Sequence, residues 1–374
     1  MSKNSKDIVF VAAQRSAIGR YKGIYKDLQA HNLGSLVIKS LIEKTKLKVD
    51  EIDEVILGQV LTGSCGQNPA RQAAINSGIP KEKTAIIINQ VCGSGLRSIV
   101  NGYQSLITNS ANFIIAGGQE SMTNSLHDQM MKDGLTDAFY NYHMGVTAEN
   151  VAAKYNISRQ EQDEFALQSQ HKAKIAIKNK KFDNEIINND IDEHPRTGIT
   201  INDLSKLNSV FKEKGTVTPG NSSGINDGAA AVVLTTRELA EKNNLEILGK
   251  IISWATCGVD PSMMGLGPIP SSNKALEIAK WNVKDLDLIE INEAFAAQSI
   301  AVIKELKVPK EKVNVNGGAI ALGHPIGASG ARIIVTLLNE LKKISGKKGL
   351  ATLCIGGGMG ISMCIEKDLS LIHI

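Results

Sequence analysis

The chain has 374 residues, which at ~150 residues per domain predicts two to three domains. With 42% hydrophobic and 21% charged residues, its composition is that of a globular protein and excludes a disordered chain. The net charge of +4 and the 4% of aromatic residues do not favour nucleic-acid binding. No apolar run approaches the ~18 residues of a membrane helix, so we expect neither a nucleic-acid partner nor a membrane span.

The N-terminus and the cysteines bear on the cellular compartment. Residues 1–7 are polar and lead directly into an apolar run at 8–13, so we expect no signal peptide or transit segment. The five cysteines are odd in number and include no Cys-X-X-Cys pair, which favours neither a disulfide framework nor a zinc site. We therefore expect a cytoplasmic protein without a metal. Each cysteine is then a core residue or a reactive thiol: Cys65, Cys92, Cys257, Cys354 and Cys364.

Apolar runs of strand length alternate with stretches of helical periodicity. In the first third of the chain, helices are predicted around 33–41 and 96–106, and strands at 8–13, 55–61, 85–88 and 113–116. The last third repeats the alternation, with a helix around 334–341 and strands at 247–255, 286–291, 313–316, 350–355 and 361–365. This order predicts an α/β fold built from βαβ units.

The two ends of the chain look like copies of one unit. Residues 49–57 and 283–291 share one order of apolar, polar and aspartate positions before a strand, and 114–118 resembles 353–357. This internal similarity indicates a duplication. The predicted domains are the first half at 1–119 and 221–246, an inserted loop domain at 120–220, and the second half at 247–367.

The predicted insert has a different composition from the two halves. It is polar, with a lysine- and asparagine-rich stretch at 178–192 and predicted helices at 146–155 and 158–177. Ser158 and Glu161 have the spacing of a capping box at the start of the second helix. The insert is either a surface excursion carried by the core or a lid that contacts a ligand, and the pattern leaves both open.

Cys92 lies in the run Asn-Gln-Val-Cys-Gly-Ser-Gly at 89–95, between a predicted strand and the next helix. A thiol at a helix N-terminus feels its partial positive charge, which favours the thiolate. The flanking Gly93 and Gly95 would let a substrate approach the backbone amides. The alternative is a small core residue, because cysteine is often buried.

His324 stands in the glycine-rich run Asn-Gly-Gly-Ala-Ile-Ala-Leu-Gly-His-Pro-Ile-Gly-Ala-Ser-Gly at 316–330. Pro325 restricts the residue before it to extended geometry, so the histidine is held in a defined direction. No Gly-Lys-Ser/Thr follows, which excludes a P-loop. The alternative is a histidine on a surface loop.

A second cysteine and an asparagine also stand near predicted strand ends. Cys354 begins Cys-Ile-Gly-Gly-Gly-Met-Gly at 354–360, which precedes a strand and therefore does not suit a dinucleotide site. It suits a thiol base beside an oxyanion hole, or a core cysteine. Asn292 begins Asn-Glu-Ala-Phe-Ala at 292–296 and would either orient a water or an oxyanion or cap a helix.

These four residues form a candidate catalytic group. Open α/β sheets carry their chemistry outside the carboxyl ends of the strands. Covalent acyl transfer needs a thiol nucleophile, an imidazole that takes its proton, and donors for the oxyanion. A second thiol suggests proton abstraction from carbon next to a thioester carbonyl.

The four quoted runs, in their order along the chain, resemble the thiolase family. The resemblance extends from about residue 8 to 366, and Tyr-His-Met-Gly at 142–145 is similar to the acyl-pocket stretch of its short-chain acetyl-CoA acetyltransferases. It implies a duplicated thiolase-like fold, in which two similar halves form a layered α/β/α/β/α core with an inserted loop domain.

The resemblance also implies a reaction and a role for each residue. The reaction is reversible Claisen condensation of two acetyl-CoA to acetoacetyl-CoA and CoA, through an acetyl-cysteine on Cys92 and with no cofactor beyond coenzyme A as substrate and product. His324 would activate Cys92 and, with a water held by Asn292, bind the thioester oxygen of the second acetyl-CoA. Cys354 would act as acid and base. The amides of Cys92 and Gly356 would form the other oxyanion hole.

Coenzyme A binding and oligomeric state follow from the same resemblance. We expect a homodimer or a homotetramer. The chain is shorter than usual for the family between 120 and 133 and between 185 and 196, and the tail at 368–374 has no counterpart and is expected to be non-native. The residues implied in coenzyme A binding are Leu135, His143, Met144, Arg196, Ser223 and Phe295.

Three alternatives compete with this function. The first is a thiolase for longer 3-ketoacyl-CoA chains. The second is a ketoacyl synthase, which is disfavoured because that family lacks a second catalytic cysteine. The third is a thiolase-like protein that binds acyl-CoA without turnover, which the presence of Cys92, Asn292, His324 and Cys354 disfavours.

Overall fold

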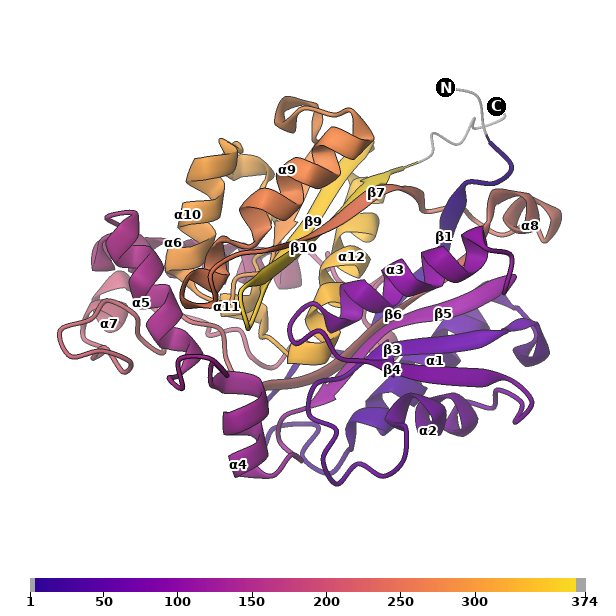
Figure 1. Cartoon of the computed structure of the whole chain (residues 1–374), viewed down its shortest axis with the longest axis horizontal. Coiled ribbons are helices and arrows are strands. Elements are labelled where there is room, and N and C mark those ends of the chain that lie inside the picture. The colour runs from indigo at the N-terminus through magenta and orange to yellow at the C-terminus, as the bar shows by residue number, and fades with distance from the viewer. Residues whose placement is uncertain (1–3, 368–374) are drawn as a thin grey trace.

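The computed structural model describes residues 4–367, so the tail at 368–374 lies outside the described residues. The strands form one mixed sheet in the order β4-β3-β5-β6-β1-β7-β10-β9-β8, and β2 pairs with β6 (Figure 1). The strands are β1 (Ile8–Arg15), β2 (Gly19–Arg20), β3 (Glu54–Gly58), β4 (Thr84–Ile88), β5 (Phe113–Ser121), β6 (Asn226–Thr236), β7 (Gly249–Gly258), β8 (Leu288–Ile291), β9 (Lys348–Ile355) and β10 (Met359–Glu366).

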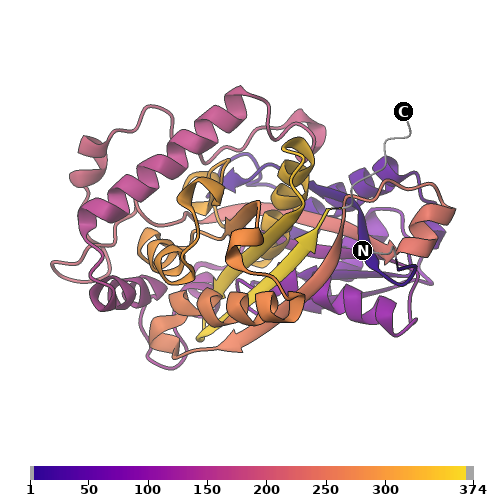
Figure 2. The same ribbon diagram turned by 90° about the horizontal axis from the view of Figure 1, so that it is seen from above.

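Helices cover both outer faces of the folded sheet and also lie between its two halves (Figures 1 and 2). None of the helices within residues 4–367 has both the length and the apolar character needed to cross a membrane. The α-helices are α1 (Ala30–Thr45), α2 (Pro69–Asn76), α3 (Ser94–Ile107), α4 (His127–Gln129), α5 (Met144–Lys154), α6 (Arg159–Lys178), α7 (Ile201–Ser205), α8 (Arg237–Lys242), α9 (Pro268–Ala279), α10 (Ala296–Leu306), α11 (Ala319–Leu322) and α12 (Ile326–Lys343).

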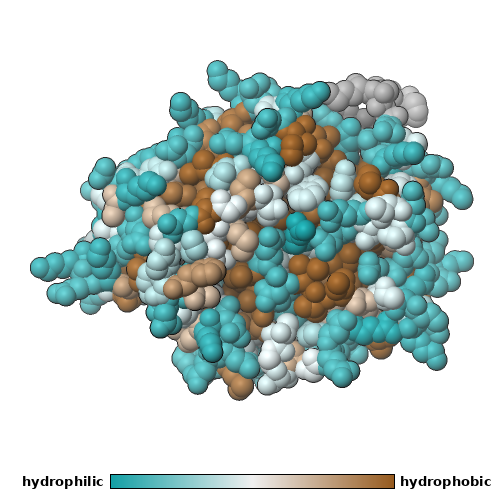
Figure 3. All heavy atoms as spheres, in the orientation of Figure 1, coloured by the Kyte–Doolittle hydropathy of each residue, from teal (hydrophilic) through white to brown (hydrophobic). Residues whose placement is uncertain are grey.

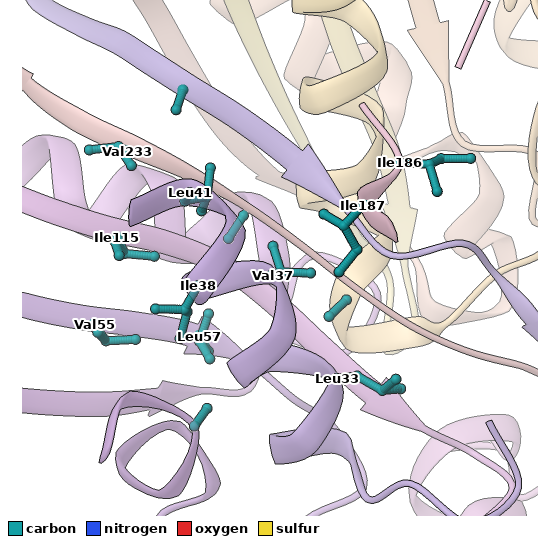
Figure 4. Packing of buried hydrophobic residues seen from close by; sticks show 14 of the residues in the cluster. Leu33, Val37, Ile38, Leu41, Val55, Leu57, Ile115, Ile186, Ile187 and Val233 are labelled. Atoms are coloured by element: carbon teal, nitrogen blue, oxygen red, sulfur yellow. The ribbon is translucent and has the colours of Figure 1, made fainter. Parts of the chain in front are cut away.

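The buried clusters define five layers. Helix α1 presents Leu33, Val37 and Leu41 on one face, at the three- and four-residue spacing of a helix, and packs them on β3, β5 and β6 (Figure 4). Helices α3 and α12 share a single apolar cluster with strands of both halves, so they form the central layer. Helices α9 and α10 pack on the outer face of the second half. The layers therefore run α/β/α/β/α, which confirms the predicted fold class.

The two halves have the same strand order. In the first, β3 pairs in parallel with β4 and β5, and β6 and β1 follow in antiparallel. In the second, β8 pairs in parallel with β9 and with a bridge at Val313, and β10 and β7 follow in antiparallel. Asp53 and Asp287, matched in sequence, also act alike, since Asp53 accepts the Asn112 N–H at 2.7 Å and Asp287 the Lys347 N–H at 2.7 Å. The duplication is thereby confirmed.

The strand register corrects the second sequence match. The β3–β5 ladder pairs Glu54 with Ile114, and the β8–β9 ladder pairs Leu288 with Gly349, so position 114 corresponds to 349. The match of 114–118 with 353–357 is therefore wrong. The first glycine pair lies inside β5, whereas the second forms the turn after β9, and their sequences look alike only because both follow apolar runs.

The strand predicted at 313–316 is also wrong. Only Val313 forms a bridge, and the chain then turns, with a positive φ of 44° at Asn314 and of 82° at Gly317. Glycine is favoured at such a φ because it has no Cβ. The apolar run at 55–61 likewise ends as a strand at Gly58, so that 59–61 form a loop beside the site described below.

The predicted insert carries a π-helical turn (Met130–Leu135) and the helices α5, α6 and α7. The capping box at α6 is confirmed, because Ser158 Oγ accepts the Glu161 N–H at 3.1 Å. Buried ion pairs from Arg15 to Asp192 and to Glu185, each 2.7 Å long, join the insert to β1. The predicted domain boundaries stay a prediction.

Candidate active site

A cavity of about 300 Å³ opens where the two halves and the insert meet. Ten of the eleven predicted site residues line it, and Asn292 lies behind it against His324. The ten are Cys92, Leu135, His143, Met144, Arg196, Ser223, Phe295, His324, Cys354 and Gly356.

Close helix packing brings Cys92 and His324 to this cavity. Each stands two residues before a central helix, Cys92 before α3 and His324 before α12. A Cβ on Gly95 would lie 2.8 Å from the Ala331 nitrogen, and one on Gly330 2.4 Å from the Leu96 nitrogen. The helices approach this closely only because both positions are glycine. Gly95 therefore serves helix packing rather than the predicted approach of a substrate.

Cys92 is half-buried and is held as a thiol at neutral pH. Burial raises the pKa of Cys92 to about 11, and the Glu120 carboxylate adds to the rise. The backbone amides of Gly356 and of Cys92 itself lie close enough to the sulfur to lower this pKa, but by less than burial raises it. The amides at the helix start therefore favour the thiolate, as expected, but desolvation is the larger effect and keeps the pKa of Cys92 high.

His324 is held in the site as a neutral imidazole. Its backbone N–H donates to Asn226 Oδ1 at 2.9 Å, and its ring Nδ1 lies 2.5 Å from Ser329 Oγ. Because the Ser329 hydroxyl donates to the Pro325 carbonyl at 2.9 Å, Nδ1 carries the ring proton and Nε2 keeps a free lone pair. Nε2 is buried without a partner among residues 4–367. Burial, and then the charge of Arg332, lower the pKa of His324 to about 4.

Cys354 and Asn292 complete the group from the second half. Cys354 lies in β9 with 0% of its surface exposed, and burial followed by the neighbouring Cys92 raises the pKa of its thiol well above the usual range. Asn292 follows β8, its Nδ2 lies 3.5 Å from His324 Nδ1, and its Oδ1 has no partner among the described residues. Asn292 thus has an unused acceptor beside the imidazole.

Aromatic rings close one side of the cavity. His143 caps α5, since its Nδ1 accepts the Gly145 N–H at 3.0 Å. Its ring stacks on Phe211 at 4.5 Å between ring centres, and Phe211 meets Phe295 edge-on at 6.3 Å. Sequence reasoning missed Phe211, because a single aromatic residue in a polar stretch has no spacing that signals a site.

The insert supplies much of the cavity wall. Leu135 comes from its π-helical turn, and His143, Met144 and Phe211 also belong to it. Arg196 is exposed at the wall, and its backbone N–H donates to Gln170 Oε1 at 2.8 Å. The insert therefore covers the side of the cavity on which a ligand would lie. This is what we expect if the insert is a lid that contacts a ligand and not a surface excursion.

The chemistry available in the cavity is that of acyl transfer. It contains two thiols, an imidazole with a free lone pair and the amides of a glycine-rich turn. Within residues 4–367, no group of three or more His, Cys, Asp or Glu side chains is arranged to hold a metal ion.

Comparison with known families agrees with this geometry. The family described as "Thiolase, N-terminal domain" matches residues 8–238, and "Thiolase, C-terminal domain" matches residues 245–367. The chain belongs to the thiolase family. The predicted resemblance is confirmed, and the two family domains of this thiolase together span nearly all of the described residues.

Similar proteins are named acetyl-CoA acetyltransferase or, for one solved structure, 3-ketoacyl-CoA thiolase. An acetyl-CoA acetyltransferase of Rhizobium meliloti is 52% identical, covering 97% of this chain and 100% of the relative. A cytosolic acetyl-CoA acetyltransferase of Rattus norvegicus is 46% identical, covering 98% and 100%. Crystal structures of the Bacillus anthracis acetyl-CoA acetyltransferase and of human mitochondrial 3-ketoacyl-CoA thiolase each have a TM-score of 0.93 at 39% identity, over 98% of this chain and 100% of theirs.

Proposed function

We propose that this thiolase is an acetyl-CoA C-acetyltransferase, which condenses two acetyl-CoA to acetoacetyl-CoA and CoA and also runs the reverse reaction. The observation that carries the proposal is the convergence of two thiols and one neutral imidazole on a single cavity. The names of the relatives at about 50% identity support the choice of acetyl-CoA. Acyl transfer moves no electrons between redox states, so coenzyme A as substrate and product is sufficient.

In the first half-reaction, the Cys92 sulfur attacks the carbonyl carbon of acetyl-CoA while His324 Nε2 takes the thiol proton. The carbonyl oxygen becomes an oxyanion that accepts from the amides of Cys92 and Gly356. The bond to the coenzyme A sulfur then breaks, and Cys354 gives its proton to that leaving sulfur. The raised pKa of Cys354 supports this step, because the thiol is protonated when substrate arrives.

In the second half-reaction, the Cys354 thiolate takes the α-proton of a second acetyl-CoA. The enolate oxygen is held by the protonated His324 and by a water on Asn292, whose free Oδ1 supports this role. The enolate carbon attacks the acetyl carbonyl, and the Cys92 sulfur leaves and recovers its proton from His324. Acetoacetyl-CoA is released with all three side chains restored, so the kinetics are ping-pong.

Intact-mass measurement after incubation with acetyl-CoA tests this function. We expect one acetyl adduct on Cys92 and release of CoA. Binding of acetyl-CoA without any adduct would instead favour an acyl-CoA-binding protein without turnover. The adduct is the decisive result because the first half-reaction forms the acetyl-cysteine and the second consumes it.

Chain length is the second point to test. The ring group of His143, Phe211 and Phe295 restricts the cavity beside the thiols, which favours a two-carbon acyl group. A thiolase for longer 3-ketoacyl-CoA chains remains the alternative, because the two solved structures are equally similar in fold and one has that activity in its name. Cleavage of acetoacetyl-CoA should exceed that of a long-chain 3-ketoacyl-CoA, and the opposite order would select the alternative.

We further propose that the chain self-associates, at least as a dimer, and works in the cytoplasm. Among residues 4–367, β4 pairs on one side only, with β3, and Ile86 in its centre is 44% exposed. An apolar open edge invites pairing with another strand, and Figure 3 shows apolar surface gathered in patches on the face drawn in Figure 1. Light scattering should report a dimer or larger species for the native chain and a smaller one for Ile86→Lys.

The proposed location in the cytoplasm rests on a different observation. The word "cytosolic" in the rat relative's name supports it.

A further inference from the structure

Glu120 is a buried carboxylate that none of the proposed steps uses. It lies near the end of β5 with 0% of its surface exposed. Its carboxylate accepts three backbone N–H groups, with Oε2 bound to Val60 at 3.0 Å and Gly327 at 2.9 Å and Oε1 bound to Leu61 at 3.2 Å. A buried charge is costly unless it is hydrogen-bonded. Burial raises the pKa of Glu120 to about 7 and the three amides oppose this rise, so they favour the charged form and hold the carboxyl group in place.

The three donors come from both halves of the molecule. Val60 and Leu61 follow β3 in the first half, whereas Gly327 lies in the first turn of α12 in the second. An N–H in a first helical turn has no partner within its helix, and a negative charge there is favourable. A Cβ on Gly327 would lie 2.9 Å from Glu120 Oε2, so a larger residue would disturb the contact.

The same carboxylate is adjacent to the supports of both reacting residues. The side chains of Val60, Leu61 and Ile326 belong to one apolar cluster, and Cys92 packs against that cluster. Ile326 begins α12 and stands two residues after His324. Loss of the contact between Glu120 and Gly327 would therefore let the start of α12 move. His324, which precedes this helix, would then shift relative to the apolar cluster on which Cys92 packs.

We propose that Glu120 is a positioning residue for the acyl transfer, which by binding the loop after β3 and the start of α12 sets the placement of Cys92 relative to His324. The inference rests on the proposed function. Glu120 acts through these backbone contacts and touches no substrate. Because small misplacements of reacting groups reduce the chemical step strongly, the effect falls on kcat.

Two variants separate geometry from charge. Glu120→Gln keeps the size but removes the charge and one acceptor oxygen, and Glu120→Asp keeps the charge but is one methylene shorter. Both should lower kcat roughly 10- to 100-fold, with KM changed less than about 3-fold. The rate of Cys92 alkylation by iodoacetamide, followed by peptide mass against pH, should move to lower pH in Glu120→Gln alone, because the carboxylate raises the pKa of Cys92.

The control is a carboxylate that also binds backbone amides but lies at the opposite end of the strands, directly before β3. Asp53 accepts from Asn112 and Phe113, so Asp53→Asn should lower Tm while kcat and the alkylation profile stay at wild-type values. Two other titratable residues interact with Glu120 and stay as in wild type in every variant: Cys65, whose pKa Glu120 raises, and Asp227, whose charge raises the pKa of Glu120.

Wild-type kcat in both folded Glu120 variants, with an unmoved alkylation profile in Glu120→Gln, would overturn the inference. Should Glu120→Gln fail to fold, Glu120→Asp decides by kcat alone. A wild-type protein that forms no acetyl adduct would refute the proposed function instead, and the alkylation profile would still test the effect of Glu120 on Cys92.

Discussion

The two halves of the molecule place different chemistry at the same position of a repeated framework. Cys92 and His324 each precede the central helix of their half by two residues. Burial acts on both in opposite senses, raising the pKa of Cys92 to about 11 and lowering the pKa of His324 to about 4. At neutral pH one group therefore holds a proton and the other has a free lone pair. The duplication gives the two halves the same geometry before the central helix, and the residue type at that position decides whether the half presents a thiol or an imidazole.

The strand ends show the same asymmetry. With position 114 matched to 349, Gln119 in β5 corresponds to Cys354 in β9. Gln119 is fully buried and donates to Gln59 Oε1 at 2.8 Å, so in the first half this position belongs to a structural amide pair. Only the second half places a thiol there. Under the proposed mechanism, the nucleophile therefore comes from the first half and the base and acid from the second.

The largest expected effect is at the nucleophile. Cys92→Ser should lower kcat by about 10³-fold or more and abolish the acetyl adduct, because a serine hydroxyl is a much weaker nucleophile than a thiol in this site. Intact mass and steady-state kinetics measure both results. Cys257→Ser is the matched control, since Cys257 is half-buried in β7 and does not line the cavity. An adduct on the Cys92→Ser protein would place the nucleophile elsewhere.

The second thiol should separate the two half-reactions. Cys354→Ser is expected to form the acetyl adduct, more slowly than wild type, yet to lose condensation by roughly 10³-fold, because general acid–base catalysis is lost at the carbon. Single-turnover acetylation and condensation assays measure the two steps. Cys364→Ser, at a buried cysteine in the adjacent strand β10, should change neither. Normal condensation in Cys354→Ser would instead favour a ketoacyl-synthase-like mechanism.

Sequence patterns reached the fold class and most of the site because both depend on local signals. Strand and helix periodicity predicted the α/β layers, and Cys92, His324 and Cys354 could be found because each stands in or directly beside a glycine-rich turn. Phe211 and Ser329 were missed, since their importance comes only from contacts made in three dimensions. Glycine pairs were misaligned between the halves because a pair inside a strand and a pair in a turn have the same sequence.

Burial of a neutral imidazole predicts a pH dependence of stability. The pKa of His324 is about 4 in the folded protein, against ~6.5 for an unperturbed histidine. Between these values the unfolded state binds the proton and the native state does not, so the free energy of unfolding falls as pH drops through this window. The full change is on the order of 3 kcal/mol.

Urea unfolding at pH 7 and at pH 4.5 measures this change. His324→Gln should show a smaller fall than wild type, and His194, whose pKa burial also lowers to about 4, contributes equally to both proteins. Equal slopes with pH in wild type and variant would mean that folding does not lower the pKa of His324.

The smallest expected effect tests how the imidazole is oriented. Ser329→Ala removes the acceptor of the Nδ1 proton, so we expect kcat to fall about 10-fold with the adduct retained, because one neutral hydrogen bond contributes roughly 1 kcal/mol. Nitrogen chemical shifts of the His324 ring should show a mixture of tautomers in place of one.

The first half offers a closely matched control for this change. Ser98 in α3 is buried like Ser329 and makes the same contact to the carbonyl four residues before it, at 2.9 Å in both cases, but faces no imidazole. Ser98→Ala should therefore cost stability alone. If the two alanine variants lost kcat equally, the effect would belong to the helices, and the proton on Nδ1 would need another explanation.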